Sequence, residues 1–388
     1  MKQRYRKLGV MMAVVLSLHT PIYGKEKEAV TTTYTLSQAI EEGLKNTSAL
    51  KVKDWEIEKA RDQSANVSAQ AQGAQMMLTY TSVVVYEKEM ELRRQADYYS
   101  REASIRVEMA RKEKKLEEIK IKKDIKDAYG NVVQGWERLQ SQQGKVDLGK
   151  NQLKAMELKE ELGMVTATSV TEAWMSLMKE EVALQEARMQ YETAFMELNG
   201  LTGRPLYEMD RMLQKMDVSL AVEIPNVEEM MEQAKIRRGD LYSAKALYDS
   251  KQSEYGSAKE LGERKYGIHE YRDELNKIEN EQIELEYRYE TLERQIKIGL
   301  EKAYTGIEMA KRQVEMMQQN LEDTEKRYEQ MKIRHELGQL SDLQLEEGTL
   351  MLQSARIQYQ SALHSYNSAL DQYFYLAGVE GVEILAGK

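Results

Sequence analysis

Histidine is the side chain most often used as a general base or metal ligand. The 388-residue chain has four, at His19, His269, His335 and His364. A metal site needs several ligands at a spacing that neighbouring elements can bring together, and these histidines have no such partner in the sequence. The chain also has no glycine-rich phosphate-binding motif and no credible pairing of a nucleophile with a base. We therefore expect neither an enzyme nor a metal or cofactor site.

The charge of the chain argues against a nucleic-acid partner. Its formal net charge is −9, whereas a nucleic-acid-binding surface needs clustered basic residues. The Lys/Arg-rich residues 111–126 are interleaved with Glu113, Glu117, Glu118 and Asp124, which favours a salt-bridged outer face. The 23 methionines suit adaptable packing between helices, and a methionine-lined substrate path is the alternative.

The amino terminus has the pattern of a secretory signal. Four basic residues precede an apolar run from Leu8 to Leu18, and Gly24 is a small residue at a plausible cleavage point. The apolar run is short for a membrane span, although an uncleaved anchor is the alternative. Cleavage after Gly24 removes the four basic residues and no acidic one, so the net charge changes from −9 to −13. We expect an exported protein without disulfides, because the chain has no cysteine.

Composition favours long helices over one large globular core. Only 41% of the residues are hydrophobic and 31% are charged. The three prolines, Pro21, Pro205 and Pro225, leave two stretches of more than 150 residues without this helix breaker.

An internal repeat organises these helices. Residues 161–203 and 336–378 align without a gap at an offset of 175, and eleven of the 43 positions are identical. Residues 36–55 match residues 227–246 at an offset of 191, so the first half has about 16 extra residues. The predicted organisation is a signal peptide (1–24), a first helical repeat (25–203), a linker (204–226), a second helical repeat (227–378) and a C-terminal tail (379–388).

Apolar residues recur with the 3.5-residue spacing of a coiled coil in both halves, from Leu275 to Met317 and from Ile125 to Met156. A second stripe that includes Leu300, Ile307 and Val314 lies beside the first, which indicates two neighbours, as in a closed ring of helices. In the second half we expect helices at about 227–261, 268–336 and 341–375.

Two Leu-Gly sequences predict tight reversals between helices. A glycine directly after a helix suits a left-handed C-cap, and a Ser or Thr that follows suits a new N-cap. Ser341 with Gln344 has the capping-box spacing, whereas Thr166 with Ser169 keeps only its first half. Each reversal could be purely structural or could dock a partner.

The chain resembles the TolC-like outer-membrane efflux proteins. Residues 36–46 (LSQAIEEGLKN) are similar to the opening helix of that family, and both Leu-Gly reversals and the closing stretches that end at Gly203 and Gly378 match in order. The resemblance implies a homotrimer whose repeats form a 12-helix hollow cylinder, the exit duct of a tripartite export system. It also implies an inner-membrane pump and an adaptor that docks at the tips. By matching position, the candidate docking residues are Gly163, Val165, Thr166, Gly338, Leu340 and Ser341. Ser169 and Gln344 stand where that family often has an acidic residue.

The membrane strands of that family are not evident here. Residues 256–268 lack the alternation of a membrane strand, and residues 76–86 could supply one strand without a second. We therefore predict an all-α protein, with long antiparallel coiled-coil helices in two tandem repeats and the membrane strands missing or reduced. It would be a TolC-like duct of the cell envelope, and the sequence leaves open whether it contacts a membrane.

A secreted structural coiled-coil protein without a transport role is the alternative function. It shares every helix signal but does not require the helices to close a ring. An export-system adaptor fits less well, because the β-rich domains of such a protein need strand and turn sequences that are not evident here.

Overall fold

The computed structural model describes residues 33–83, 85–215 and 224–381. The predicted signal peptide lies outside these residues, as does most of the predicted C-terminal tail. The described chain is almost wholly helical, which confirms the predicted fold class. Its elements are β1 (Thr33–Tyr34), α2 (Leu36–Asn46), α3 (Ser48–Tyr80), α4 (Tyr86–Arg93), the π-helix η2 (Arg94–Tyr98), α5 (Tyr99–Glu161), α6 (Ala167–Thr202), β2 (Met212–Leu213), α7 (Val227–Arg237), α8 (Gly239–Lys265), α9 (Ile268–Glu336) and α10 (Asp342–Leu376).

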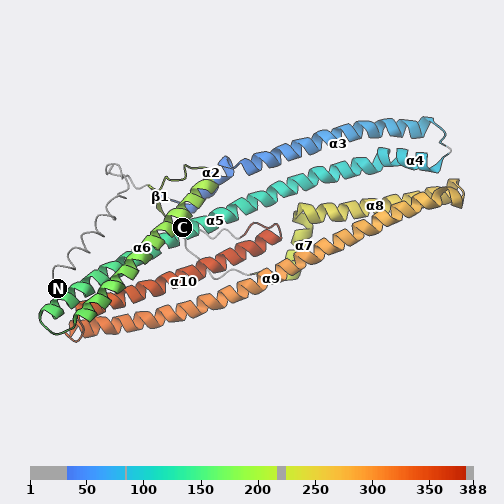
Figure 1. Cartoon of the computed structure of the whole chain (residues 1–388). Coiled ribbons are helices and arrows are strands. Elements are labelled where there is room, and N and C mark those ends of the chain that lie inside the picture. Colours follow the sequence, from blue (N-terminus) through green and yellow to red (C-terminus); the bar gives the residue numbers. More distant parts are fainter. Residues whose placement is uncertain (1–32, 84, 216–223, 382–388) are drawn as a thin grey trace.

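The helices form an elongated layer built on the two long helices α5 and α9 (Figure 1). In one half of the molecule α3 packs on α5, α5 on α8, and α8 on α9. In the other half α6 packs on α5, α5 on α10, and α10 on α9. Helix α5 is therefore in the middle of the layer over its whole length, whereas α9 runs along one edge and α3 and α6 form the opposite edge.

The apolar stripes of these helices meet in two main clusters. Helices α7, α9 and α10 bury one cluster that includes Leu300, Ile307 and Val314, the predicted second stripe of α9. Helices α2, α5 and α6 bury the other, around Ile125, Tyr129 and Phe195. The Tyr129 hydroxyl lies 2.7 Å from the Tyr34 carbonyl oxygen and 2.9 Å from that of Gln214, so it ties the short parallel pair β1–β2 to α5.

Helix boundaries recur at the two offsets of the internal repeat. Helices α2 and α7 have the same length and begin at the offset of 191, and α3 and α8 begin at the same offset. The ends of α5 and α9 are related by the offset of 175, as are the starts of α6 and α10. Segments that match in the sequence thus begin or end helices at matching positions.

The prediction of a single helix at residues 227–261 was wrong. The chain breaks at Arg238, whose ψ of 128° is extended, and two helices result. The Arg238 guanidinium donates a hydrogen bond of 3.1 Å to the carbonyl oxygen of Leu376, at the end of α10. At Gly239 a Cβ atom would lie 2.7 Å from the Met109 carbonyl oxygen, so the break lets the chain pass close to α5.

The extra residues of the first half lengthen a helical hairpin. Helix α3 is six residues longer than α8 (33 against 27). The connection from α3 to α4 is also longer than the one from α8 to α9. Finally, α4 starts seven residues before the position that matches the start of α9 at the offset of 175. At ~1.5 Å per residue, α3 gains roughly 9 Å. Residues 76–80, considered above as part of a strand, are helical. Within the described residues the strands are limited to β1 and β2.

A buried cluster of charges joins the two hairpins at this end, which we call the distal end. Arg94 of η2 is paired with Glu254 of α8 at 2.5 Å and with Glu274 of α9 at 2.8 Å, and all three side chains are largely buried. Glu89 of α4 accepts hydrogen bonds from Tyr266, Arg93 and Lys265. Buried charges persist only when paired, so these contacts fix one hairpin against the other.

We predict that Glu89 makes the distal end sensitive to acid. Burial alone would raise the pKa of Glu89, but the hydrogen bonds from Lys265, Tyr266 and Arg93 outweigh burial and lower it to about 2. A carboxyl with a lowered folded-state pKa stabilises the protein above its unfolded pKa, and that stability is lost as the pH falls from 4.5 toward 2. The variant Glu89→Gln should be less stable at pH 7 and should lose less stability between pH 5 and pH 2 (about the range bounded by these two pKa values).

Urea unfolding followed by circular dichroism across this pH range measures the effect. Glu87→Gln, an exposed carboxyl on the same helix, is the matched control. An acid profile of Glu89→Gln that overlays that of the parent protein would contradict the prediction.

Candidate docking tips

The two predicted reversals are the connections α5–α6 and α9–α10, and both lie at the end of the molecule opposite the distal end (Figure 1). We call them tip 1 (residues 162–166) and tip 2 (residues 337–341). Helix α5 just before tip 1 contacts α10 just after tip 2, since Gln152 donates a hydrogen bond of 2.7 Å to Glu347. The tertiary structure thus brings together two segments that belong to different repeats.

Both tips have the same backbone geometry. Gly163 and Gly338 have φ values of 70° and 69°, in the left-handed region that favours glycine. In tip 1 the Gly163 N–H donates to the Glu160 carbonyl and the Met164 N–H to that of Lys159, each at 2.8 Å. Tip 2 has the same two bonds, from Gly338 to His335 and from Gln339 to Arg334. This is the Schellman motif, which satisfies the last carbonyls of a helix.

The helix starts that follow differ as the sequence predicted. The Ser341 hydroxyl accepts from the Gln344 N–H at 3.4 Å and the Gln344 side chain accepts from the Ser341 N–H at 3.0 Å, so α10 has a full capping box. The Thr166 hydroxyl accepts from the Ser169 N–H, also at 3.4 Å, without the reciprocal bond. The absence of a glutamine or glutamate at position 169 explains the difference.

The structure places the six candidate residues in two settings. Gly163, Thr166, Gly338 and Ser341 are exposed at the surface of the tips. Val165 and Leu340 are half-buried. The first four could contact a partner directly, whereas Val165 and Leu340 can also stabilise the reversal itself.

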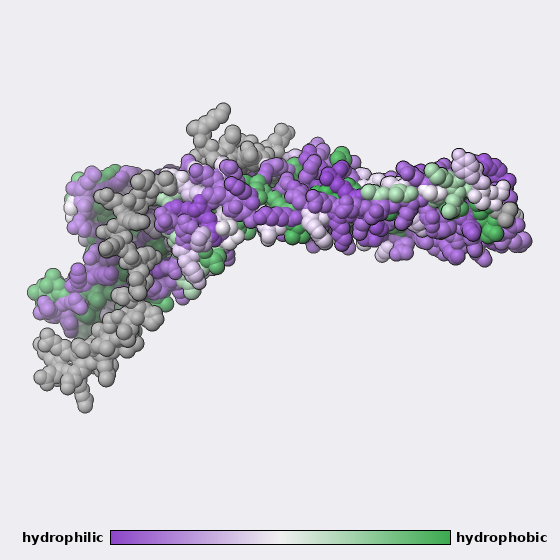
Figure 2. Space-filling view, turned by 90° about the horizontal axis from the view of Figure 1, so that it is seen from above, coloured by the Kyte–Doolittle hydropathy of each residue, from purple (hydrophilic) through white to green (hydrophobic). Residues whose placement is uncertain are grey.

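The sequence analysis did not select the apolar residues beside the glycines. Leu162, Met164 and Leu337 are largely exposed, and Figure 2 shows hydrophobic residues among hydrophilic ones at this end of the molecule. Exposed large apolar side chains that gather at one place are typical of protein contact surfaces. The sequence did contain a signal for these exposed residues. Large apolar residues flank each left-handed glycine, whereas the tip of an isolated hairpin would favour polar residues.

A hydrogen-bond contact distinguishes tip 2 from tip 1. The His335 Nε2 lies 2.7 Å from a carboxylate oxygen of Asp342, across the reversal. The matching residues of tip 1 are Glu160 and Ala167, which cannot form this pair. The sequence showed no ligand-spaced partner for His335, and Asp342 comes close to it only through the fold-back at tip 2.

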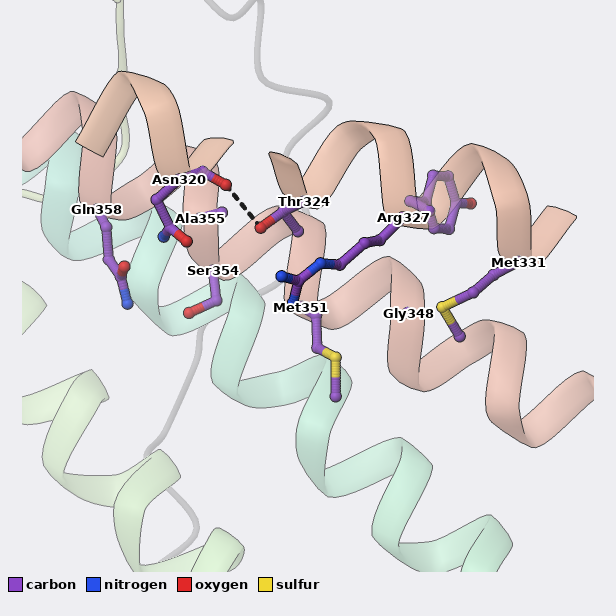
Figure 3. Close-up of a pocket in the computed structure, with 10 residues that line it drawn as sticks. Asn320, Thr324, Arg327, Met331, Gly348, Met351, Ser354, Ala355 and Gln358 are labelled. Carbon is purple, nitrogen blue, oxygen red and sulfur yellow. Dashed lines mark hydrogen bonds between the residues drawn. The ribbon is translucent and has the colours of Figure 1, made fainter. Parts of the chain in front are cut away.

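An open groove runs between α9 and α10 behind tip 2 (Figure 3). Met331 of α9 points toward Gly348 of α10, where its sulfur would lie 2.8 Å from an added Cβ. Arg327 of α9 extends over the groove, and the exposed Met351 lies on the α10 side. The small residue at position 348 thus lets the two helices pack closely and leaves a groove lined by methionine and one guanidinium.

Neither a metal centre nor a membrane-spanning helix is found where the structure is described. Within residues 33–83, 85–215 and 224–381 there is no group of three or more histidine or acidic side chains placed to hold a metal ion. The helices in those ranges contain no stretch that is long and apolar enough to cross a membrane.

The fold described above matches those of solved outer-membrane proteins. The chain has the TolC-like fold. The Campylobacter jejuni CmeC outer membrane channel matches with a TM-score of 0.64 at 14% sequence identity, over 93% of this chain and 91% of that chain. The Neisseria gonorrhoeae MtrE outer membrane channel matches with a TM-score of 0.62 at 12% identity, over 89% of each chain. A membrane protein from Pseudomonas aeruginosa matches with a TM-score of 0.64 at 14% sequence identity, over 91% of this chain and 92% of that chain.

No protein-family model and no curated protein matches the chain. This chain and the solved structures thus share the TolC-like fold although most of their side chains differ. A helical layer tolerates such differences, because it needs only a periodic pattern of apolar residues and residues that end each helix at the right position.

We predict that the left-handed glycines hold the TolC-like tips in place. In the double variant Gly163→Val, Gly338→Val a β-branched residue must adopt a left-handed conformation, at a cost of roughly 1–2 kcal/mol per site. The nearest atoms are more than 4 Å from an added Cβ at both glycines, so the effect should come from the backbone alone. Hydrogen exchange should accelerate at residues 158–167 and 333–342, with almost unchanged helicity by circular dichroism.

The matched control is Gly73→Val, Gly256→Val. These glycines also have no atom within 4 Å of an added Cβ, but their φ values are not positive. Equal exchange at the tips of the variant, the control and the parent protein would show that the tips do not depend on the left-handed glycines.

Proposed function

We propose that the protein is the exit duct of a tripartite export system of the cell envelope, in which copies of the chain close into a homotrimeric helical channel. The observation that carries this proposal is the single helical layer with two uncovered edges. Helix α9 runs along one of these edges and carries the exposed apolar residues Ile283, Tyr287, Met309 and Met316. An isolated soluble monomer rarely keeps such a row of exposed apolar residues along a helix.

The shape of the edges favours a ring. The edge formed by α9 differs from the edge formed by α3 and α6, so a contact between them is heterologous and joins copies head to tail. A repeated head-to-tail contact closes into a ring when the rotation permits. Three chains with two long hairpins each would supply the 12 helices that the family resemblance implies, and the TolC-like fold supports this arrangement.

The tips then supply the place for a partner. In a closed ring every tip 1 and tip 2 lies at the same end, because both tips of one chain do. We propose that an adaptor protein, itself attached to an inner-membrane pump, docks there on Gly163, Val165, Thr166, Gly338, Leu340 and Ser341. The exposed Leu162, Met164 and Leu337 support this role, since buried apolar anchors account for much of the binding energy in protein interfaces.

Light scattering tests the assembly. The purified mature protein at micromolar concentration should have about three times the mass of one chain. A helical protein that stays monomeric across this concentration range would instead favour the alternative, a secreted structural coiled-coil protein of the envelope, because such a protein does not need to close a ring.

An export assay tests the docking role. In cells of the source organism, the variant Gly163→Val, Gly338→Val should abolish export of the system's substrate while the assembled mass stays unchanged. The control Gly73→Val, Gly256→Val should export normally. Normal export by the tip variant would show that the tips are only structural.

A further inference from the structure

A polar cavity of about 360 Å³ lies in the distal half of the layer, where α3 and α8 flank the π-helix η2 (Figure 1). Small-molecule sites have volumes of ~300–1,000 Å³, so a small ligand fits this space. Residues between 75 and 79 of α3 and between 250 and 257 of α8 form two of its walls. The cavity is in the half of the molecule opposite the tips, and the proposed adaptor site does not use it.

The cavity is built around the π-helix. Four of the five residues of η2 line it, namely Arg94, Ala96, Asp97 and Tyr98. Short π-helices inside α-helices are rare and frequently occur at functional sites. At the offset of 175 the matching residues 269–273 belong to the regular α-helix α9. The repeat therefore does not impose the π-helix, which is found where the cavity is.

A buried hydroxyl in the cavity wall has no partner. Ser250 lines the cavity and is 7% exposed, and its Oγ has no hydrogen-bond partner among the described residues. Most buried polar side-chain atoms have a partner, because an unsatisfied one destabilises the fold. Ser253 and Ser257 lie three and seven residues further along the same face of α8 and also line the cavity. A bound ligand with hydrogen-bonding groups would satisfy Ser250.

The charges in the cavity are already compensated. The charged residues that line it are Arg93, Arg94, Arg101, Asp97 and Glu254. The three arginines are paired with Glu89, Glu254 and Asp97, respectively. The second carboxylate oxygen of Glu254 lies 2.8 Å from the Lys251 ammonium. An ionic ligand would bring an uncompensated charge into a partly buried site, so the balance of charges favours a neutral ligand.

The remaining polar groups favour a ligand that both donates and accepts hydrogen bonds. Guanidinium groups only donate and carboxylates only accept, whereas the hydroxyls and the Gln75 amide can do both. Leu78, Met90 and Tyr98 add apolar surface to the cavity. A sugar ring has hydroxyls around its rim and apolar C–H groups on its faces. It therefore matches both the polar and the apolar parts of the lining.

We propose that this cavity binds a neutral saccharide, with the Ser250 hydroxyl as one of its hydrogen-bond partners. The inference goes beyond the proposed duct, because the residues of the cavity all come from one chain. In a ring the cavity stays open, since copies that meet at the edges of the layer leave its faces free. The two flanking helices α3 and α8 and the middle segment η2 form the cavity on such a face.

Saturation-transfer NMR of the purified mature protein tests the class of ligand. The neutral probes are glucose, N-acetylglucosamine, maltotriose and chitotriose, and the charged analogues are glucosamine and glucose phosphate. We expect saturable binding of at least one neutral probe at millimolar concentration or below, and weaker binding of both charged analogues. Stronger binding of a charged analogue would overturn the neutral ligand. The absence of saturable binding for every neutral probe would overturn the site.

A tryptophan in the cavity tests its location. Ser253→Trp should remove saturable sugar binding, because the indole ring takes up the space that the sugar needs. The matched control is Gln252→Trp, since Gln252 is the adjacent exposed residue of α8 and does not line the cavity. Circular dichroism and light scattering should give the same helicity and mass for both variants and the parent protein. Equal sugar binding by the two variants would overturn the location.

The variant Ser250→Ala tests the unpartnered hydroxyl. It should weaken sugar binding a few-fold, as expected for one hydrogen bond, without lowering the stability of the free protein, because the lost hydroxyl has no partner there. Ser104→Ala is the control, since Ser104 is an exposed serine of α5 whose hydroxyl donates to the Ser100 carbonyl. Unchanged sugar binding by Ser250→Ala would overturn the role of this hydroxyl.

Sedimentation with insoluble cell-wall glycan separates two sources of the sugar. Co-sedimentation that Ser253→Trp abolishes would support the cavity and assign its ligand to the envelope. Binding of soluble sugars alone would support the cavity and assign its ligand to a solute.

The outcomes also separate this inference from the proposed duct. A protein with three times the mass of one chain that binds no sugar would overturn only the cavity. A monomer that binds sugar would support the cavity and overturn the ring.

Discussion

Coverage of the long helices on both flanks is the constraint on which this structure depends. A long helix with many charged residues is stable in water mainly through the neighbours that cover its apolar stripe. Helix α5 has such neighbours along its whole length, α3 and α8 in the distal half and α6 and α10 toward the tips. Helix α9 repeats the pattern of α5 but is covered by α8 and α10 along one side. The difference between these two helices leaves one edge of the layer uncovered along α9.

The reversals at the tips share one compact construction. Each combines a left-handed glycine, two bonds to the end of the preceding helix and a hydroxyl cap for the next helix. Such a compact connection leaves little chain beyond the helices, so the apolar residues beside the glycine are held at the outermost surface. Tip 2 adds the contact between His335 and Asp342, so the two tips have similar shapes but different chemistry.

The distal end is held together differently. There the hairpin formed by α3 and α4 extends past the one formed by α8 and α9, and buried ion pairs centred on Arg94 and Glu89 join them. Apolar packing tolerates small shifts, whereas charges removed from water need their partners in fixed positions. The charge cluster therefore fixes one hairpin against the other at the distal end.

Much of this architecture is determined by local sequence. The absence of proline, the seven-residue apolar period, and the Leu-Gly sequences followed by Thr or Ser specify the long helices and both tips, including the bounds of α9 and the one-sided cap at Thr166. These signals act within one or two helical turns, so a single sequence can reveal them. The candidate residues at the tips were identified for the same reason.

Only the tertiary structure decided the rest. The break at Arg238 depends on a bond to the end of α10 and a close approach to α5, and the pair of His335 and Asp342 depends on the fold-back at tip 2. Likewise, the sequence shows that Met309 and Gln134 occupy matching positions, but not that one is exposed and the other buried. That distinction depends on which helices lie beside α5 and α9, and non-local packing of this kind is not encoded in the period of any one helix.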